Sequence, residues 1–590
     1  FQTNPHGMRG QGIFENVRGV NRDWSGIWFA ETGFTDYGWY GEIAIPFKSI
    51  SFDPNSSSWG ISFDRGLESK AEDIAWTSYN RSVNPSNFGT AVGFSDLKQG
   101  MGLDLIPGLS ISESRAYGLD PNEPDSSETN FEPTLDAFYK ITPNLTGALT
   151  FNSDFSATEV DNRQIQLTRF NLFFPEQRKF FLQEADIFEF GDLNRNGRPF
   201  FSRRIGIGRG GQQLDIEAGG KLTGRVGRWN VGALAVKQSG NADFVSGGGQ
   251  LINDSELFVG RVSANVLNQS TIGAIATYGN PTGDEDNNLV GVDFNYLNTE
   301  SFDNVTIIGN AWYQQTDTDG LQGDDSAWGV KLMSPNQEGL QGRIQHIKIG
   351  KNFFPALGFA NRTGITETEA AVGHTKRFGA GARLRSLENS IEITRITDSE
   401  GNVESEALEL ELAQIQNQFG DQALLMFNDV REVLTRPFNI VDGVAVPIGD
   451  YSYQRYGAEV STGGRRPLIV TLHLEDGGFF NGDRKTANLR FDWQPSKYFT
   501  GVFEYEYNKI DLPQGKFNTQ LLRLRTDIAF NPEWAWITTA QYDNQSDSLG
   551  INSRLQWIPR AGSEFYIIYN GGWLDRDETG FSQVGESATV

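Results

Sequence analysis

The C-terminal part of the chain alternates apolar and polar side chains over six successive segments, each roughly ten residues long. In the first segment, Leu489, Phe491 and Trp493 alternate with Arg490 and Asp492. Successive side chains of a β-strand point to opposite faces, so each segment is predicted to be a strand with one apolar and one charged face. The six predicted strands cover 486–493, 499–508, 522–530, 534–543, 551–557 and 564–570.

The apolar faces of these strands are rich in aromatic residues, among them Trp534, Trp536 and Tyr542. Amphipathic rings near strand ends suit the boundary between lipid and water. A soluble β-sandwich would instead pack its apolar faces against a second sheet, and it rarely sustains so many long aromatic strands. The pattern therefore favours an all-β fold with a large transmembrane antiparallel β-barrel, in the outer membrane of a bacterial cell, over a soluble all-β domain.

The charged faces carry opposite signs on neighbouring strands, as is typical of a polar barrel lumen. Two glutamates would stand between arginines on both sides and attract them. The residues predicted to line the lumen are Arg490, Glu504, Glu506, Arg523 and Arg525.

The turns between these strands alternate between short and long. Asn531-Pro532 is very short, whereas 509–519 and 544–550 are expected to be longer loops. Outer-membrane barrels keep short turns on the periplasmic side and long loops outside. The strand that ends near Asn570 is therefore expected to point outward, and a closing strand that would begin near Ala588 is expected to be missing from the chain.

Alternation extends back to Phe131, so residues 131–590 are predicted to form a barrel of roughly 20 to 26 strands. Residues 107–130 include an acidic run and are predicted to be a linker. Residues 1–106 combine short strands with Gly- and Pro-containing turns, and they are predicted to form a partial β-sandwich domain on the periplasmic side. Further barrel strands are predicted at 214–224, 228–237, 256–267, 270–279, 288–298, 304–314, 325–333, 340–350, 381–397, 404–417, 421–432, 450–462 and 466–475.

Composition narrows the classes of protein further. The chain has 590 residues, no cysteine and a formal net charge of −25. It therefore has neither a disulfide framework nor a thiolate metal site, and its acidic balance argues against nucleic-acid binding. It contains no apolar run near the roughly 20 residues of a membrane helix, and a membrane protein without such helices must be a closed barrel. The expected partners are outer-membrane lipid and lipopolysaccharide, the latter contacted by acidic external loops through divalent cations.

Residues 171–200 interrupt the alternation. They hold too many aromatic residues for a solvated loop and too many charges for a lipid-facing strand, so they are predicted to form a plug in the lumen or under the barrel. A basic spot on this segment and just after it consists of Arg178, Lys179, Arg203 and Arg204. These residues are expected to pair with lumen carboxylates; alternatively, they would guide an anionic solute through the pore.

Four blocks of sequence carry a family resemblance: LFFPEQR at 172–178, FFLQEADIF at 180–188, FSRRIG at 201–206 and GGKLTG at 219–224. They resemble the DUF5916 family of outer-membrane barrels. Members of that family carry a family-9-like carbohydrate-binding domain before the barrel, and residues 1–7, 38–47 and 59–65 look like the second half of such a domain. The resemblance implies that the first half is absent from this chain and that a glycan is an expected ligand.

Trp76, with the sequence NPSNFG after it at 84–89, is similar to a sugar site of the broader carbohydrate-binding family. Two tryptophan side chains clamp the sugar in that family, and the first of them would lie in the absent half. A single aromatic face gives modest binding energy. The alternative is that Trp76 belongs to the core of its domain.

Asp192, Asn194 and Asn196 stand at alternate positions in DLNRNG, which matches the first half of a calcium-binding loop. The twelfth position of such a loop requires an acid, and Arg203 occupies it here. A tight Asn/Gly turn is the alternative. Apart from this calcium ion, no cofactor is expected.

The chain shows no recognisable catalytic motif. Its histidines, His6, His346, His374 and His473, lack metal-ligand spacing, and neither a Gly-x-Ser-x-Gly elbow nor a P-loop is present. The protein is therefore expected not to be an enzyme. Two hypotheses are preferred: a channel or an export or uptake component that handles glycan or another polymer, and a scaffold whose plugged barrel anchors a surface or periplasmic protein. A third, an outer-membrane enzyme with a Ser–His pair, would need clustered Ser, His and acid residues at the rim.

Overall fold

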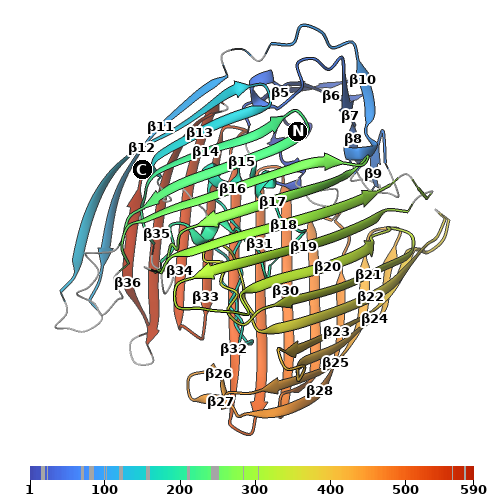
Figure 1. Cartoon of the computed structure of the whole chain (residues 1–590), viewed down its shortest axis with the longest axis vertical. Coiled ribbons are helices and arrows are strands. Elements are labelled where there is room, and N and C mark those ends of the chain that lie inside the picture. Colours follow the sequence, from blue (N-terminus) through green and yellow to red (C-terminus); the bar gives the residue numbers. More distant parts are fainter. Residues whose placement is uncertain are drawn as a thin grey trace.

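The computed structural model describes residues 1–590 except 15–19, 23, 25, 68–71, 79–84, 99, 101, 119–123, 154–159, 194, 209–212, 241–251, 284, 300, 303–304, 380, 465, 561 and 577–579. Its main body is a closed antiparallel barrel of 24 strands, which confirms the predicted class and architecture. The strands follow one another round the barrel in chain order, from blue to red in Figure 1. The hairpin β26–β27 (Phe438–Val441 and Val444–Val446) is a separate sheet between β25 and β28.

The barrel strands are 9 to 17 residues long, enough to cross the hydrocarbon core of a membrane at a tilt. The first half comprises β11 Leu103–Ala116, β12 Ser126–Thr142, β13 Leu145–Ser153, β14 Ile216–Val226, β15 Trp229–Gln238, β16 Ser255–Val266, β17 Ser270–Tyr278, β18 Asn287–Asn298, β19 Ile307–Thr318, β20 Ser326–Ser334, β21 Gly339–Ile349 and β22 Ile365–Arg377. The second half comprises β23 Leu384–Asp398, β24 Val403–Asn417, β25 Gln422–Leu434, β28 Gly449–Ser461, β29 Leu468–Phe479, β30 Gly482–Ser496, β31 Phe499–Leu512, β32 Gly515–Ala529, β33 Trp534–Asp543, β34 Ser548–Arg560, β35 Ser563–Arg576 and β36 Gly580–Thr589.

The described N-terminal residues form small two-stranded sheets around an aromatic core. Trp28 and Phe52 are buried there, and Trp59 stacks on Phe94 with ring centroids 4.7 Å apart. The strand pairs are β1 Gln2–Thr3 with β2 Arg9–Gly10, β3 Ile13–Phe14 with β4 Val20–Asn21, β5 Phe29–Thr35 with β6 Gly38–Ala44, β7 Ser58–Ile61 with β10 Gly89–Val92, and β8 Asp64–Leu67 with β9 Glu72–Ala75. Two helical turns, η1 Phe47–Ser49 and η3 Pro85–Asn87, lie between them.

This N-terminal part lies at one end of the barrel, which we call the near rim (Figure 1). The Lys48 ammonium pairs with Asp104 at 2.6 Å, and the Lys140 ammonium donates to the Ile50 carbonyl at 2.6 Å. Connections at the near rim include the short turns 143–144, 227–228 and 497–498, whereas the opposite far rim carries 239–254, 350–364 and 435–448. The far rim also has two-residue turns at 480–481 and 513–514, so short turns occur at both rims and the longest connections gather at the far rim.

The structure corrects three predictions about strand boundaries. Residues 107–130 are not a linker, because β11 and β12 pair from Leu103↔Tyr139 to Ala116↔Ser126. The polar tail is not a free end: it forms β36, which closes the barrel by pairing with β11 along Ser112–Ala116. The expected loop 509–519 is mostly strand, since its turn is only 513–514, and the expected loop 544–550 is a shorter turn at 544–547 that leads into β34.

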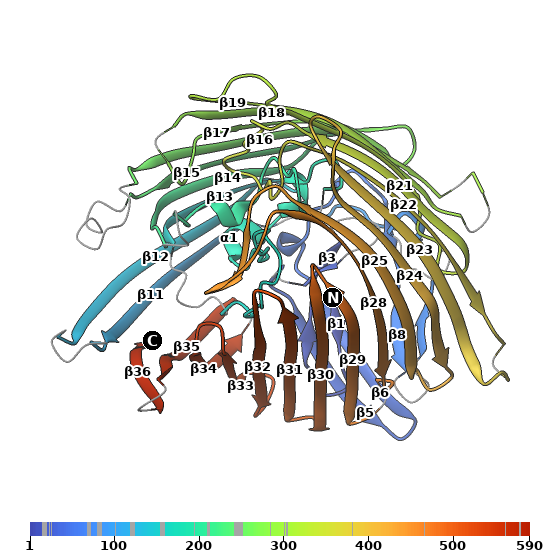
Figure 2. The same cartoon turned by 90° about the horizontal axis from the view of Figure 1, so that it is seen from below.

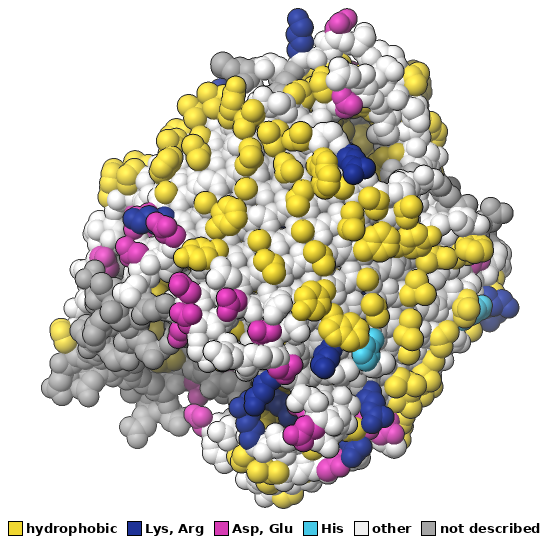
Figure 3. Space-filling model, in the orientation of Figure 1, with side chains coloured by type: hydrophobic (Ala, Val, Ile, Leu, Met, Phe, Trp, Pro, Cys, Tyr) yellow, Lys and Arg dark blue, Asp and Glu magenta, His cyan; other side chains and the backbone are white. Residues whose placement is uncertain are grey.

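The outer face of the barrel is apolar. Exposed side chains over β14–β22 form the yellow band of Figure 3. Outward-facing residues with more than half of their surface exposed include Val290, Val292, Leu332, Leu340 and Ile344. An exposed apolar face of this extent is stable only against lipid, so it is the membrane-facing surface.

The connection between β13 and β14 folds into the barrel, as the teal segment inside the ring of strands shows (Figure 2). We call its first part, residues 160–170, the strap, and residues 171–208 the plug. The plug contains the short helix α1 Lys179–Leu182 and the turns η4 Ala185–Phe188 and η5 Ser202–Arg204. The segment that interrupts the alternation of the strands therefore lies on the inner side of the barrel wall. Among the described residues, no helix is long and apolar enough to cross a membrane.

Two apolar clusters hold this inward segment against the wall. The larger joins plug residues such as Phe180 and Ile205 to inward-facing side chains of β14–β22, including Leu234, Leu289 and Ile349. The smaller joins the strap to the far-rim ends of β25 and β29–β31 and to the β26–β27 hairpin; its members include Leu167, Leu434, Val446, Phe479 and Ile510. The core of this barrel is therefore inside the lumen.

Candidate functional site

The strap is tied to the barrel wall by two arginines. The Arg163 guanidinium pairs with Asp543 at 2.9 Å and donates to the Ser548 hydroxyl at 2.8 Å. The Arg169 guanidinium pairs with Glu432 at 3.3 Å and donates to the Val433 carbonyl at 3.3 Å. These contacts join residues that lie far apart in the sequence, so the strap crosses the inner face from β33 to β25.

The plug is fastened by a buried ion pair on the opposite part of the wall. Arg261 of β16 and Asp293 of β18 pair at 2.6 Å with almost no solvent exposure. Asp293 also accepts a hydrogen bond from the Gly191 backbone N–H of the plug at 3.1 Å. A buried charge pair is stable only when its remaining hydrogen-bonding groups are satisfied, and the plug backbone supplies one of them here.

Further polar anchors follow the same pattern. The buried Lys221 ammonium of β14 donates to the plug carbonyls of Phe180 and Gln183. The Gln238 side chain accepts from the Gly206 N–H at 2.7 Å, and the Gln314 side chain donates to the Gly197 carbonyl. Wall side chains therefore satisfy plug backbone groups that would otherwise be buried without partners.

The predicted calcium ligands take part in this fastening. Asp192 pairs with Lys331 of β20. The side-chain amide oxygen of Asn196 accepts from the backbone N–H groups of Asn361 and Arg362 at 2.7 and 3.1 Å. Asn194 lies outside the described residues. In the part of the chain that the structure describes, no group of three or more His, Asp or Glu side chains is arranged to hold a metal ion.

The predicted basic spot lies on the plug, and three of its four members pair with carboxylates. Arg178 pairs with Glu176 at 2.6 Å, Lys179 reaches Glu564 of β35 at 2.5 Å, and Arg203 pairs with Asp161. The Arg204 guanidinium donates to the Ala356 carbonyl at 3.5 Å, and burial lowers its pKa. Of these three carboxylates, Glu564 belongs to the barrel wall, whereas Glu176 lies in the plug and Asp161 in the strap. Most of the pairing is therefore within the inward segment.

Glu176 makes the plug sensitive to acid. Burial alone would raise the pKa of the Glu176 carboxyl, but hydrogen bonds from Arg178 and Ser202 outweigh burial and hold the pKa below its usual range. A depressed folded-state pKa stabilises the fold above the unfolded value of about 4.3, and the contribution is lost as pH falls through the folded pKa. We expect the free energy of unfolding to fall in this acidic window, and to fall less in Glu176→Gln. Parallel pH profiles of the two proteins would contradict this role.

The predicted charge ladder forms on the wall next to the strap. Glu504 of β31 pairs with Arg490 of β30 and, at 2.8 Å, with Arg523 of β32. Arg525 pairs instead with Asp527 of its own strand at 3.1 Å, and Glu506 accepts from Asn508 at 3.0 Å. The Arg523 guanidinium also donates to the Arg163 carbonyl of the strap, which places this face of the sheet inside the barrel.

The two parts of the wall differ in how far the inward segment covers them. Inward-facing residues of β15–β20 are buried, with Leu234, Leu289 and Ala327 at most 2% exposed. On β30 and β32 the inward-facing side chains of Arg490 and Arg525 are 45% and 37% exposed. The plug therefore fills one side of the lumen and leaves the charged wall accessible to solvent.

Trp76 stands at the end of β9 and is 58% exposed. Its ring contacts Phe63, with centroids 6.1 Å apart, and lies over Gly89, where a Cβ atom would come within 2.6 Å of the indole. Trp28 and Trp59, rather than Trp76, are the tryptophans of the local core.

The sequence analysis missed the wall residues that fasten the plug, Arg261, Asp293 and Lys221. A signal for them was present in β16, whose inward positions also include Leu257 and Val259. A strand that is apolar on both faces is expected where both faces are covered. By contrast, no sequence pattern indicated which plug residue each of these three wall residues would contact.

The closed barrel and its lipid-facing exterior make this an outer-membrane β-barrel, and comparison with solved structures finds similar folds. A mutant of the ferric enterobactin receptor PfeA from Pseudomonas aeruginosa shares 10% identity over 82% of this chain and 80% of its own, with a TM-score of 0.38. The siderophore receptor PirA from Acinetobacter baumannii shares 8% identity over 82% and 80%, with a TM-score of 0.37. OpdK from Pseudomonas aeruginosa, solved with vanillate, shares 10% over 57% and 93%, with a TM-score of 0.31.

At these identities and TM-scores the likeness carries no argument about function. No match was found among curated proteins. The family resemblance, in contrast, is confirmed where the motifs lie. Residues 102–244, which hold β11–β15 and the plug, match the family model described as Domain of unknown function (DUF5916).

Proposed function

We propose that the protein is an outer-membrane channel that passes a hydrophilic solute, with glycan or a related polymer as the cargo. The observation that supports it is the uneven filling of the lumen. Fixed ion pairs on β30–β32 stay accessible to solvent beside a plug that covers the opposite wall. A polar wall of this kind lowers the barrier for a hydrated solute.

The arrangement of the rims supports an orientation for this channel. The longest connections gather at the rim opposite the N-terminal part, and outer-membrane barrels keep their long loops outside and short turns on the periplasmic side. The N-terminal domain would then stand at the periplasmic mouth. Its exposed Trp76 ring offers a flat surface on which a sugar could stack there.

The outer face supports lipopolysaccharide as the neighbour at the far rim. Arg431 pairs with Asp450 at 2.8 Å and with Glu406 at 3.1 Å, and all three share the face of exposed Ile393. Charged groups beyond an apolar band suit the headgroup region of a membrane.

Single-channel conductance of the purified chain in a planar bilayer tests the proposal. Steady conductance that falls when a neutral oligosaccharide is added would support a channel for that class of cargo. A barrel that stays closed under all applied voltages would contradict it. That result would favour a scaffold, for which the dense anchoring of the plug by Arg261, Asp293 and Lys221 is the supporting observation.

Replacing Glu504 with glutamine is expected to shift the ion selectivity of the channel towards anions. Arg490 and Arg523 would both lose their shared carboxylate on the accessible wall. The reversal potential in a KCl gradient measures the shift. Stability should change by less than about 1 kcal/mol because partly exposed ion pairs contribute little.

The matched control is Glu406→Gln, which removes a carboxylate of the outer face with similar exposure. It should leave the reversal potential unchanged. Equal shifts in both variants would mean that the ladder on β30–β32 does not line the ion path.

A further inference from the structure

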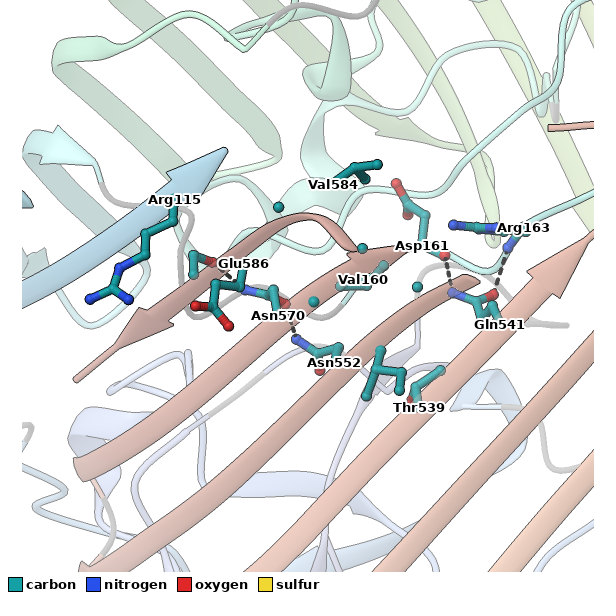
Figure 4. Close-up of a pocket in the computed structure, with 16 residues that line it drawn as sticks. Arg115, Val160, Asp161, Arg163, Thr539, Gln541, Asn552, Asn570, Val584 and Glu586 are labelled. Carbon is teal, nitrogen blue, oxygen red and sulfur yellow. Dashed lines mark hydrogen bonds between the residues drawn. The ribbon is translucent and has the colours of Figure 1, made fainter. Parts of the chain in front are cut away.

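A cavity of about 520 Å³ lies between the start of the strap and the inner face of β33–β36 (Figure 4). The strap contributes Val160, Asp161 and Arg163, and the wall contributes Gln541, Asn552 and Asn570. Sites for small organic ligands have volumes of roughly 300 to 1,000 Å³. The cavity is therefore large enough for a ligand of several rings.

Neutral amides and a hydroxyl form a continuous row along its floor. The Asn552 side-chain amide donates to the Asn570 carbonyl oxygen at 2.6 Å, and the Asn570 amide donates to the Ser587 hydroxyl at 3.2 Å. Each amide nitrogen carries two hydrogens and each amide oxygen two lone pairs, so the row retains donors and acceptors beyond these bonds. Such a row complements hydroxyl groups, which also donate and accept.

The arginines beside the cavity are each paired with a carboxylate. Arg163 pairs with Asp543, and Asp161 pairs with Arg203. The Gln541 side chain, between them, accepts from the Arg163 N–H at 2.8 Å and donates to the Asp161 carbonyl at 3.1 Å. Two further charged residues line the cavity: Arg115 pairs with Glu113 at 2.6 Å, and the Glu586 carboxylate accepts from the Tyr117 hydroxyl at 2.8 Å. Because each arginine is paired with a carboxylate, the cavity offers an anionic ligand no counter-charge and favours an uncharged one over it.

Two glycines of the inner face keep the cavity open. A Cβ atom at Gly550 would come within 3.0 Å of the Arg163 guanidinium. At Gly572 a Cβ atom would make only ordinary contacts, with Val584 at 3.5 Å and the Gly585 carbonyl oxygen at 3.9 Å, so a larger side chain there would extend into the open space. The floor is therefore backbone edged by amides, on which a ring-shaped solute can lie flat.

We propose that this cavity is a binding site for an uncharged, polyhydroxylated solute, a short neutral saccharide. The inference names the solute class for the channel proposed above and rests on that function. It places recognition inside the barrel beside the strap, at a distance from Trp76 on the N-terminal part.

Isothermal titration calorimetry of the full chain in detergent micelles tests this site, with maltotriose as the neutral probe and trigalacturonate as an anionic one. We expect maltotriose to bind and trigalacturonate to bind at least about tenfold more weakly. The double substitution Asn552→Ala and Asn570→Ala should raise the Kd for maltotriose about tenfold, as the loss of two hydrogen-bonding side chains predicts. Gly572→Leu, which fills the cavity and leaves the amides in place, should abolish binding.

The matched control is Asn488→Ala, on the inner face of β30 and thus about 20 Å round the wall from β34. Its Kd should equal that of the unchanged chain. Four results would overturn the site: no binding of maltotriose, tighter binding of trigalacturonate, an unchanged Kd in both cavity variants, or binding lost in Trp76→Ala but kept in the amide double variant. Circular dichroism of each variant verifies that the barrel has folded.

Conductance measured on the same preparations separates this inference from the proposed function. A conducting barrel that fails to bind maltotriose refutes the cavity site and leaves the channel standing. A barrel that binds maltotriose but never conducts refutes the channel and leaves the site standing.

Discussion

Replacing Asp293 with alanine is expected to destabilise the barrel by about 3–5 kcal/mol, the usual consequence of removing one partner of a buried ion pair. The Arg261 guanidinium would remain buried without its counter-charge, and the Gly191 N–H of the plug would lose its acceptor. The free energy of unfolding in urea, followed by tryptophan fluorescence, measures the loss.

Two further variants test the cause of this loss. Arg490→Ala removes a partly exposed arginine from the ladder and should cost less than about 1 kcal/mol. The pair Arg261→Met with Asp293→Leu replaces both charges by apolar groups and should recover most of the loss. A cost for Asp293→Ala as small as that for Arg490→Ala would show that this pair does not fasten the plug.

Excising the plug is expected to raise the single-channel conductance severalfold. A barrel of 24 strands encloses a wide aqueous lumen unless a segment fills it. Replacing residues 171–208 by a short Gly/Ser linker would clear the wall that Phe180 and Ile205 now cover. Planar-bilayer recordings measure the change.

Excision also exposes apolar wall residues such as Leu234 and Leu289, so folding must be verified by circular dichroism. Asp293→Ala is the second variant, because it loosens the plug without removing it. It should produce more frequent openings rather than a permanently larger conductance. An unchanged conductance in the excised protein would mean that the ion path does not pass beside the plug.

The strand pattern was predictable because lipid imposes it. Every second residue of a barrel strand must be apolar, and the strands predicted at 256–267, 288–298 and 404–417 agree with β16, β18 and β24 within a residue. The first strand, β11, escaped prediction because the acidic run within 107–130 predicted a linker, although prolines such as Pro107 are tolerated at unpaired strand positions. Pro107 lies where β11 pairs only with β12, and Pro133 lies beyond the pairing of β12 with β13, so neither position needs a second ladder hydrogen bond.

The site was predictable only where its partners are neighbours in the sequence. Glu504 and Arg490 lie on adjacent strands, and their pairing followed from the alternation. Arg163 and Asp543 are 380 residues apart, and no local pattern connects them. Asp192 shows the same limit: its spacing matched a calcium loop, and in the fold it pairs with Lys331 of the wall on which the plug packs.

The strap and plug both belong to a single connection. Its two ends leave the wall at Ser153 and Ile216, which are paired across β13 and β14. The hydrogen-bond ladder between β13 and β14 closes beneath this connection as it would beneath a tight turn. The entropic cost of closing a loop grows only with the logarithm of its length. The stability of the ladder between β13 and β14 therefore depends little on what the connection contains. The segment that fills the lumen is thus an insertion between two paired strands. It can be replaced by another segment without changing the register of any strand.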